Sequence, residues 1–174
     1  MLKGKRILIA AGGTGGHINP ALGTAGYIKE KDPDAEIIFV GTKDKMEARL
    51  VPQAGYELRT IDISGFYRSF SPEAIKHNLG TLSKLLHASS QAKKIIKDFK
   101  PDLVVGFGGY VSGPVLRMAA KMGVPTAIHE QNAFPGVTNK ALAGRVDRVM
   151  LTAKQAEKYM KPKNPCVVTG LPIR

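Results

Sequence analysis

Short apolar runs rich in Val, Ile and Leu alternate along the chain with longer stretches that have helical periodicity. The runs carry apolar residues at consecutive positions, which is typical of strands that are covered on both faces of a sheet. We therefore predict strands over residues 6–11, 36–40, 56–63, 102–106, 125–129, 148–151 and 166–169.

The segments between these strands predict helices. Apolar residues recur at every third or fourth position over 71–99, where Ser71 serves as a cap and Pro72 as the first helical residue. Gly80 predicts a break or bend within this long stretch. Further helices are predicted over residues 20–31, 113–121 and 135–143.

This alternation predicts an α/β fold with a doubly wound parallel sheet, that is, a Rossmann-like fold. We expect one domain over residues 1–169, with 170–174 as the start of an interdomain hinge. In such sheets ligands bind beyond the carboxyl ends of the strands, where the strand order reverses. The ends of three predicted strands are unusual in composition and are therefore candidate parts of a site.

The first strand is followed at residues 10–17 by the sequence AAGGTGGH. Glycine permits positive φ and close approach of a ligand to the main chain, and a helix that starts after the loop directs free N–H groups at that ligand. We expect a phosphate or sugar site here, with His17 as a general base at its rim. The alternative is that the imidazole merely caps the helix.

The same region excludes two common nucleotide-binding motifs. Read from Gly13, the dinucleotide fingerprint Gly-x-Gly-x-x-Gly lacks its third glycine. The second predicted strand ends in Val40-Gly41-Thr42, where a nicotinamide enzyme has an acidic residue for the ribose. The chain also lacks the Gly-Lys-Ser or Gly-Lys-Thr of a P-loop.

Two further strand ends are candidates. The sequence GFGGYVSGP at 106–114 is a second glycine-rich turn that leads into a helix, and its Tyr110 and Ser112 supply hydrogen-bonding groups. We expect anion or sugar binding here, the alternative being a tight turn alone. The fifth predicted strand ends in HEQN at 129–132. Alternation along a strand directs His129 and Glu130 to opposite sides, so we expect at most one of them to face a ligand.

A formal net charge of +12 in 174 residues predicts a negatively charged partner. The basic residues are spread along the chain with no Arg-rich tract, so we expect no nucleic acid and favour an anionic membrane or a phosphorylated substrate. Cys166 is the only cysteine, which fits a cytoplasmic protein. The apolar run near the N-terminus is too short for a secretory signal or a membrane span.

Taken in this order, GGTGGH at 12–17, GGYVSGP at 108–114 and HEQN at 129–132 resemble the motifs of the MurG family of peptidoglycan glycosyltransferases. Each motif alone is weakly specific, whereas the three together are highly specific. One departure is Leu171, because the family commonly has Asn after the glycine of this hinge motif. The resemblance extends to intervening residues at 40–42, 46–47, 63–65, 101–102, 138–140 and 170–174.

The resemblance implies inverting transfer of N-acetylglucosamine from UDP-N-acetylglucosamine to the C4 hydroxyl of the muramyl sugar in lipid I, the undecaprenyl-diphosphate-linked acceptor, to form lipid II. Members of the family have two Rossmann-like halves in the GT-B arrangement, and this chain corresponds to the first, acceptor-binding half. We interpret it either as an excised domain without the C-terminal donor domain or as a non-catalytic subunit that needs a separate donor-binding chain. A related glycosyltransferase that acts on another lipid is disfavoured by the match of all three motifs.

The resemblance and the loop positions together predict the roles of individual residues. His17 is expected to be the catalytic base, with Glu130 as the alternative base or as a group that orients the nucleophile. The donor is expected to contact Thr14, Gly15, Gly16, Asn132 and Arg174. The acceptor is expected to contact Gly12, Gly13, Gly108, Gly109, Tyr110, Ser112, His129 and Gln131.

No cofactor or metal is expected, since the chain lacks clustered carboxylates suited to Mg²⁺. The acceptor that the resemblance implies is anchored in a bilayer, so we expect a peripheral protein at the cytoplasmic face of the cell membrane. Membrane contact is expected at residues 66–70, where FYRSF combines aromatic side chains with an Arg. For the lysines of the following helix, we favour the alternative that they are simply solvated.

Overall fold

In the described part of the chain, seven parallel strands form one sheet in the order β3-β2-β1-β4-β5-β6-β7. The structure is a computed structural model that describes residues 4–63 and 72–173, with the backbone alone described over 72–83. The strands are β1 (Arg6–Ala10), β2 (Glu36–Gly41), β3 (Glu57–Thr60), β4 (Leu103–Gly106), β5 (Thr126–Glu130), β6 (Arg148–Leu151) and β7 (Val167–Val168).

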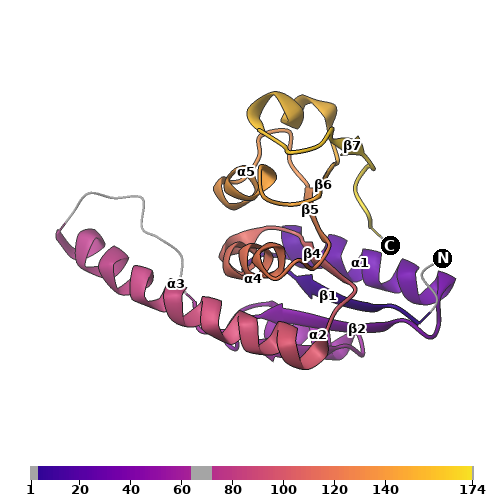
Figure 1. Cartoon of the computed structure of the whole chain (residues 1–174), viewed down its shortest axis with the longest axis horizontal. Coiled ribbons are helices and arrows are strands. Elements are labelled where there is room, and N and C mark those ends of the chain that lie inside the picture. Colours follow the sequence, from indigo (N-terminus) through magenta and orange to yellow (C-terminus); the bar gives the residue numbers. More distant parts are fainter. Residues whose placement is uncertain (1–3, 64–71, 174) are drawn as a thin grey trace.

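Helices cover both faces of this sheet (Figure 1). One face packs against α1 (Gly15–Lys31) and α2 (Glu47–Gln53). The other face packs against α3 (Pro72–Phe99), α4 (Gly109–Lys121), α5 (Val137–Ala143) and the 3₁₀ helix η1 (Lys154–Tyr159). No helix in the described residues is long and apolar enough to cross a bilayer.

The two cores follow from the alternation of side chains along the buried strands. On β1, Ile7 and Ile9 belong to the core under α1 and α2, while Leu8 and Ala10 belong to the core under α3 and α4. All four are fully buried. An uninterrupted apolar run is therefore needed at the centre of the sheet, and the sequence has one at residues 7–11.

The strand order reverses between β1 and β4. From β1 the chain builds outward through β2 to β3, and from β4 it builds outward in the opposite direction to β7. The predicted doubly wound parallel sheet is thus confirmed. The loops after β1 and β4 lie on either side of the switch point, the expected place for a ligand site.

Two helices begin earlier than predicted. The Thr14 carbonyl accepts hydrogen bonds from the amides of His17 and Ile18, so α1 begins inside the glycine loop and His17 lies in its first turn. In the same way α4 begins at Gly109 and takes in Tyr110 and Ser112. Of the break or bend predicted at Gly80, the break is wrong, because α3 is helical throughout; it also extends past the edge of the sheet (Figure 1). The short elements α2 and η1 were not predicted.

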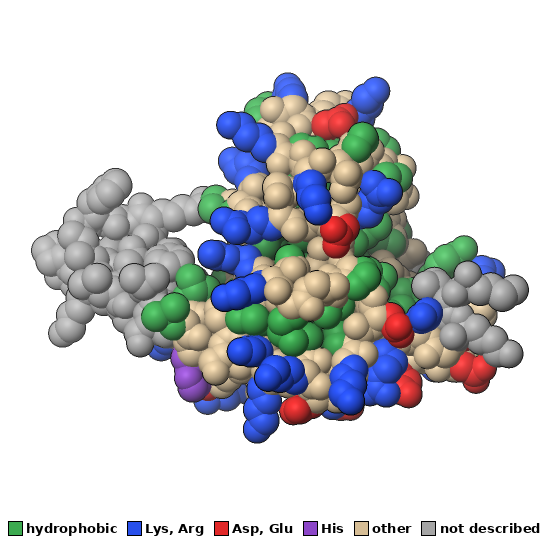
Figure 2. Space-filling model, viewed as in Figure 1, with side chains coloured by type: hydrophobic (Ala, Val, Ile, Leu, Met, Phe, Trp, Pro, Cys, Tyr) green, Lys and Arg blue, Asp and Glu red, His purple; other side chains and the backbone are tan. Residues whose placement is uncertain are grey.

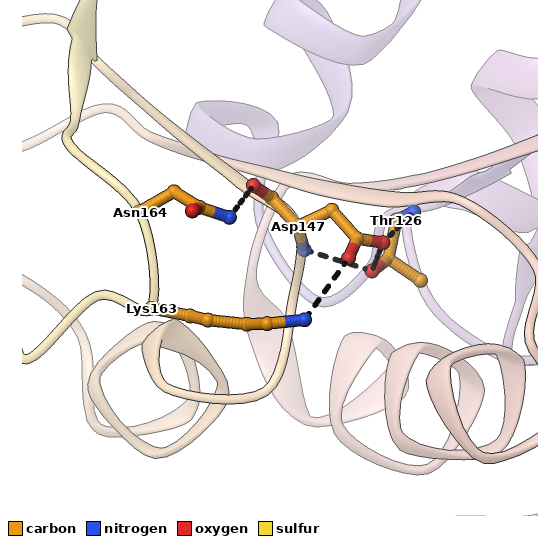
Figure 3. Close-up of polar contacts among 4 residues, drawn as sticks. All are labelled: Thr126, Asp147, Lys163 and Asn164. Carbon is orange, nitrogen blue, oxygen red and sulfur yellow. Dashed lines mark hydrogen bonds and ion pairs between the residues drawn. The ribbon is translucent and has the colours of Figure 1, made fainter.

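A polar cluster connects the loop between η1 and β7 to the starts of β5 and β6 (Figure 3). The Asp147 carboxylate accepts hydrogen bonds from the Thr126 amide at 3.0 Å and the Thr126 hydroxyl at 2.9 Å. Lys163 lies 3.6 Å from the same carboxylate, and the Asn164 side chain donates to the Asp147 carbonyl at 3.0 Å. These hydrogen bonds from Thr126, the hydroxyl first, lower the pKa of Asp147.

Candidate functional site at the carboxyl edge of the sheet

Two glycine-rich loops meet where the strand order reverses. Ala10 and Gly106 are paired in register at the ends of β1 and β4, and the Phe107 amide donates to the Ala10 carbonyl over 2.9 Å. Gly109 has φ +72°, and a Cβ at this position would collide with the Gly12 carbonyl oxygen. Glycine is therefore required at the point where the two loops touch, and the loops form one continuous surface.

His17 stands in the first turn of α1, half-buried between these loops. Its Nδ1 lies 3.1 Å from the Gly12 carbonyl oxygen and 3.2 Å from the Thr14 hydroxyl. Because a carbonyl oxygen can only accept, we infer that Nδ1 carries the proton of the neutral ring. This tautomer leaves a lone pair on Nε2, as a general base needs.

Two hollows share His17 and Asn132 in their linings. The first, of about 410 Å³, is also lined by the start of α1, the loop after β5 and the C-terminal segment, namely Thr14, Gly15, Gly16, Asn19, Pro20, Gln131, Leu171 and Ile173. The second, of about 420 Å³, lies at the start of α4 and α5 and includes Gly108, Gly109, Tyr110, Glu130, Gly136, Val137, Thr138 and Asn139. A group on His17 can therefore face occupants of both hollows.

Glu130 is 1% exposed at the end of β5, and both of its carboxylate oxygens are engaged. One oxygen accepts from the Asn132 amide at 3.0 Å and from its side chain at 3.1 Å. The other accepts from the Gly136 amide at 3.1 Å and the Asn139 side chain at 2.8 Å. Glu130 thus accepts four hydrogen bonds that hold the loop between β5 and α5 in place. This geometry suits a residue that orients neighbouring groups better than one that transfers a proton.

His129 lines neither hollow and instead holds the C-terminal segment. Its Nε2 donates to the Gly170 carbonyl at 3.0 Å, and the Gln131 side-chain amide donates to its Nδ1 at 3.2 Å. Burial lowers the pKa of His129, so the ring is neutral at neutral pH. Gln131 lines the first hollow and not the second.

Tyr110 and Ser112 differ in accessibility although both lie in the first turn of α4. Tyr110 lines the second hollow, and partial burial raises the pKa of its hydroxyl. Ser112 is fully buried, with its hydroxyl bonded to the Gly108 amide, the Gly108 carbonyl and the Ala10 carbonyl. The Ser112 hydroxyl therefore shapes the second loop from within.

Two buried polar residues at the site received no role from the sequence, although both lie in stretches that resemble the family (46–47 and 138–140). Asn139 is 2% exposed and bonds both Glu130 and the His129 carbonyl. Glu47, at the start of α2, is fully buried under the first glycine loop. Glu47 and Val51 are four residues apart, so recognising a helix there would have placed Glu47 on the buried face.

Among the described residues, no group of three His, Cys, Asp or Glu side chains is arranged to hold a metal ion. Arg174 and residues 66–70, for which donor and membrane contacts were predicted, lie outside the described residues.

The fold and the paired glycine loops define a Rossmann-like domain of the kind found in GT-B glycosyltransferases. Residues 7–151 match the glycosyltransferase family 28 N-terminal domain, and the chain belongs to this family.

The relatives carry a more specific name. The chain is 53% identical over 169 residues to a protein of Acetivibrio thermocellus, and 50% identical over 167 residues to one of Lactococcus lactis subsp. cremoris. Both are named UDP-N-acetylglucosamine–N-acetylmuramyl-(pentapeptide) pyrophosphoryl-undecaprenol N-acetylglucosamine transferase. The matches cover 97% and 96% of this chain but 45% of each relative, so the chain spans about half of their length.

Solved structures agree with this assignment. MurG of Acinetobacter baumannii superposes with a TM-score of 0.78 at 32% identity, over 95% of this chain and 45% of that one. The predicted resemblance to the MurG family is thus confirmed. The UDP-GlcNAc 2-epimerase of Neisseria meningitidis has a TM-score of 0.66 at 13% identity, over 96% of this chain and 47% of the epimerase, which indicates a shared fold alone.

Proposed function

We propose that this chain is the acceptor-binding half of an inverting N-acetylglucosaminyltransferase. The complete enzyme would transfer N-acetylglucosamine from UDP-N-acetylglucosamine to the C4 hydroxyl of the muramyl sugar in lipid I and so form lipid II. The observation that carries the proposal is the pair of hollows that share His17 and Asn132 in a chain about 50% identical to transferases of that name.

In the proposed reaction His17 acts as the base. Its Nε2 takes the proton from the C4 hydroxyl as that oxygen attacks the anomeric carbon from the side opposite the UDP leaving group, which departs with the bond electrons. The orientation of the ring by the Gly12 carbonyl supports this assignment, because it leaves the Nε2 lone pair available. Glu130 serves as the residue that fixes the neighbouring loop, and it remains the alternative base.

We assign the donor to the first hollow. Thr14, Gly15, Gly16 and Asn132 line it, and the first turn of α1 begins there without a side-chain cap in the described residues. Its uncapped N–H groups suit an anionic ligand. Arg174 is a proposed further donor contact, and the C-terminal half of the complete protein would close this side.

We assign the acceptor diphosphate and sugar to the second hollow. Gly108, Gly109 and Tyr110 line it at the start of α4, a second helix without a side-chain cap in the described residues. Gly12, Gly13 and Ser112 would act by holding the shape of the loops. His129 and Gln131, also predicted on the acceptor side, would act by fixing the loop after β5 and the C-terminal segment.

Titration of this chain, followed through its backbone-amide NMR signals, tests the assignment. A soluble short-chain analogue of lipid I should shift the signals of residues 108–110 and His17, whereas UDP-N-acetylglucosamine alone should bind weakly. A matched ligand without the diphosphate should bind more weakly than the complete analogue. Absence of any response to the lipid I analogue would contradict the acceptor assignment.

Whether a donor-binding half follows Arg174 in the full gene product would distinguish an excised domain from a natural subunit that needs a separate donor-binding chain.

We also propose that the chain binds the anionic cytoplasmic face of the cell membrane. A hollow of about 610 Å³ between α3 and α4 combines the apolar Leu85, Leu86 and Met118 with the exposed cations Arg117, Lys121 and Arg145. Leu86 is 71% exposed. Lys and Arg side chains gather on this face of the molecule (Figure 2), as contact with an anionic leaflet requires.

A further inference from the structure

Glu47 is a fully buried carboxylate to which the proposed chemistry gives no role. Three donors converge on it: the Gly13 amide reaches Oε2 at 3.0 Å, and the Thr42 amide and hydroxyl reach Oε1 at 2.9 and 2.7 Å. A carboxylate is an acceptor alone, so all three bonds have the correct polarity. Burying an acidic side chain is costly without such partners, so the cluster is a built feature of the loop.

The bond from Gly13 connects Glu47 to His17 through a single peptide group. The N–H of this group belongs to Gly13 and donates to Glu47, while its C=O belongs to Gly12 and accepts from His17 Nδ1 at 3.1 Å. A peptide group is planar and stiff, so fixing one end fixes the direction of the other. Gly13 has φ +92°, which gives this peptide group an orientation that few other residues would permit.

Glu47 also packs directly against the first glycine loop, in addition to its hydrogen bond with it. A Cβ on Gly12 would lie 2.7 Å from Glu47 Oε1, so the carboxylate fills the space under the loop. Hydrogen bonds in series polarise one another, and a carboxylate on the N–H side makes the carbonyl on the other side a better acceptor. The arrangement therefore favours the tautomer of His17 with the proton on Nδ1.

We propose that Glu47 is the positioning residue for His17, acting through the peptide group between Gly12 and Gly13. The inference rests on the proposed function only in taking His17 as the base. Glu47 does not touch the proposed substrates. It holds the ring so that Nε2 presents its lone pair at the wall between the two hollows.

Substitution of Glu47 by Gln in this chain tests the proposal through the NMR signals of the folded protein. A glutamine turns its NH₂ group either toward the Gly13 amide or toward the two Thr42 donors. Even when its oxygen faces Gly13, that oxygen is uncharged and a weaker acceptor, so the bond from the Gly13 amide weakens in both cases. We expect exchange of the Gly13 amide proton to become faster by on the order of 10- to 100-fold. The ¹⁵N shifts of the His17 ring should move from an Nδ1–H tautomer toward a mixture of both.

Val51→Ala is the matched control. Val51 is 1% exposed one turn further along α2, so its truncation weakens the packing of this helix and leaves the carboxylate in place. Its His17 ring signals should match those of the unsubstituted protein. If Val51→Ala moves them as far as Glu47→Gln does, the effect is merely structural and the proposal is wrong.

Thr42→Val decides the question if Glu47→Gln does not fold. This variant removes one donor from the carboxylate, and the His17 ring signals should shift in the same direction by a smaller amount, with Thr42→Ser restoring them. Unchanged ring signals in the folded variants would overturn the proposal. The His17 ring signals can be measured without substrate, so the two proposals can fail separately. If the ring signals respond to these substitutions but the chain does not bind the lipid I analogue, only the proposed function is refuted.

Discussion

The imidazole of His17 takes its orientation from a main-chain carbonyl, that of Gly12. The glycine loop therefore has two tasks, to approach a ligand closely and to set a tautomer. A side chain at Gly109 would push against that same carbonyl, so the second loop constrains the histidine as well. The proposed base thus depends on the backbone of two loops.

Replacing His17 by Ala in the protein joined to its donor half should reduce turnover by about 10²- to 10⁴-fold, because general-base catalysis contributes about that much. The measurement is the steady-state rate at saturating substrates, with circular dichroism to verify the fold. His87→Ala is the matched control, since His87 is exposed on α3 and lies 3.8 Å from Asp62. A His17→Ala enzyme within a few-fold of the unsubstituted rate would remove His17 as the base.

Asp147→Asn should lower the Tm of this chain at pH 7 by about 2–4 °C, which corresponds to about 1 kcal/mol in a domain of this size. The pKa of Asp147 is lowered by its hydrogen bonds from Thr126, so the carboxylate stabilises the fold above the usual Asp pKa of about 4. This contribution is lost as the pH falls through the lowered pKa of the folded state. The difference in Tm between the two proteins should therefore shrink below about pH 4.

Asp44→Asn is the control for this pH series. Asp44 is exposed and lies 3.9 Å from Lys45, a contact of the kind that contributes little. A similar loss of Tm in Asp44→Asn would show that the effect reflects net charge rather than the cluster in Figure 3.

At the scale of elements, α1 carries the proposed base and also packs against the C-terminal segment. Gly23 faces this segment, and a Cβ there would lie 2.7 Å from the Pro172 carbonyl oxygen. Since that obstacle is backbone, it cannot move aside as a flexible side chain would. The close approach of the segment to α1 therefore requires glycine.

Gly23→Ala should displace residues 170–173 from α1 and lower the Tm, even though alanine favours a helix by about 0.5–1 kcal/mol over glycine. Amide exchange at residues 170–173 should become faster. Gly113→Ala in α4 is the control, because its Cβ would meet Thr138 at an ordinary 3.8 Å and should raise the Tm slightly. Equal protection of the segment in both variants would contradict this account.

The sheet could be predicted from the sequence because its central strands are buried on both faces. Uninterrupted apolar runs such as 37–40 are best satisfied by a strand that is buried on both faces. The short α2 was missed because seven residues with Pro52 inside carry little periodic signal. The early start of α1 was missed because Gly15 and Gly16 are typical of a loop, whereas here the Thr14 carbonyl begins the helix.

The site could be located from the sequence, but the role of each polar group could not. The two glycine-rich motifs and the HEQN motif lie at one edge of the sheet because parallel strands bring their carboxyl ends together. Which partner each buried side chain finds depends on contacts far apart in the chain. Ser112 is bonded to Ala10, and His129 to Gly170, neither of which is a neighbour in sequence.

For the whole molecule, the net charge of +12 predicts binding to membranes that weakens with salt. The chain should sediment with anionic liposomes at low ionic strength and much less at high ionic strength. Arg117→Gln should weaken binding by about fivefold, the effect of about 1 kcal/mol per basic residue near the surface. Lys31→Gln, which removes one charge from α1 on the other face of the sheet, should have a smaller effect. Absence of binding at low salt would contradict the proposal.

The two hollows have one wall in common, formed by His17 and Asn132. An occupant on one side that shifts this wall changes the affinity on the other, and thermodynamic linkage requires the same factor in both directions. In the complete enzyme, binding of either ligand should therefore raise or lower the affinity for the other. Substitutions at Asn132 should alter that coupling factor as well as the two separate affinities.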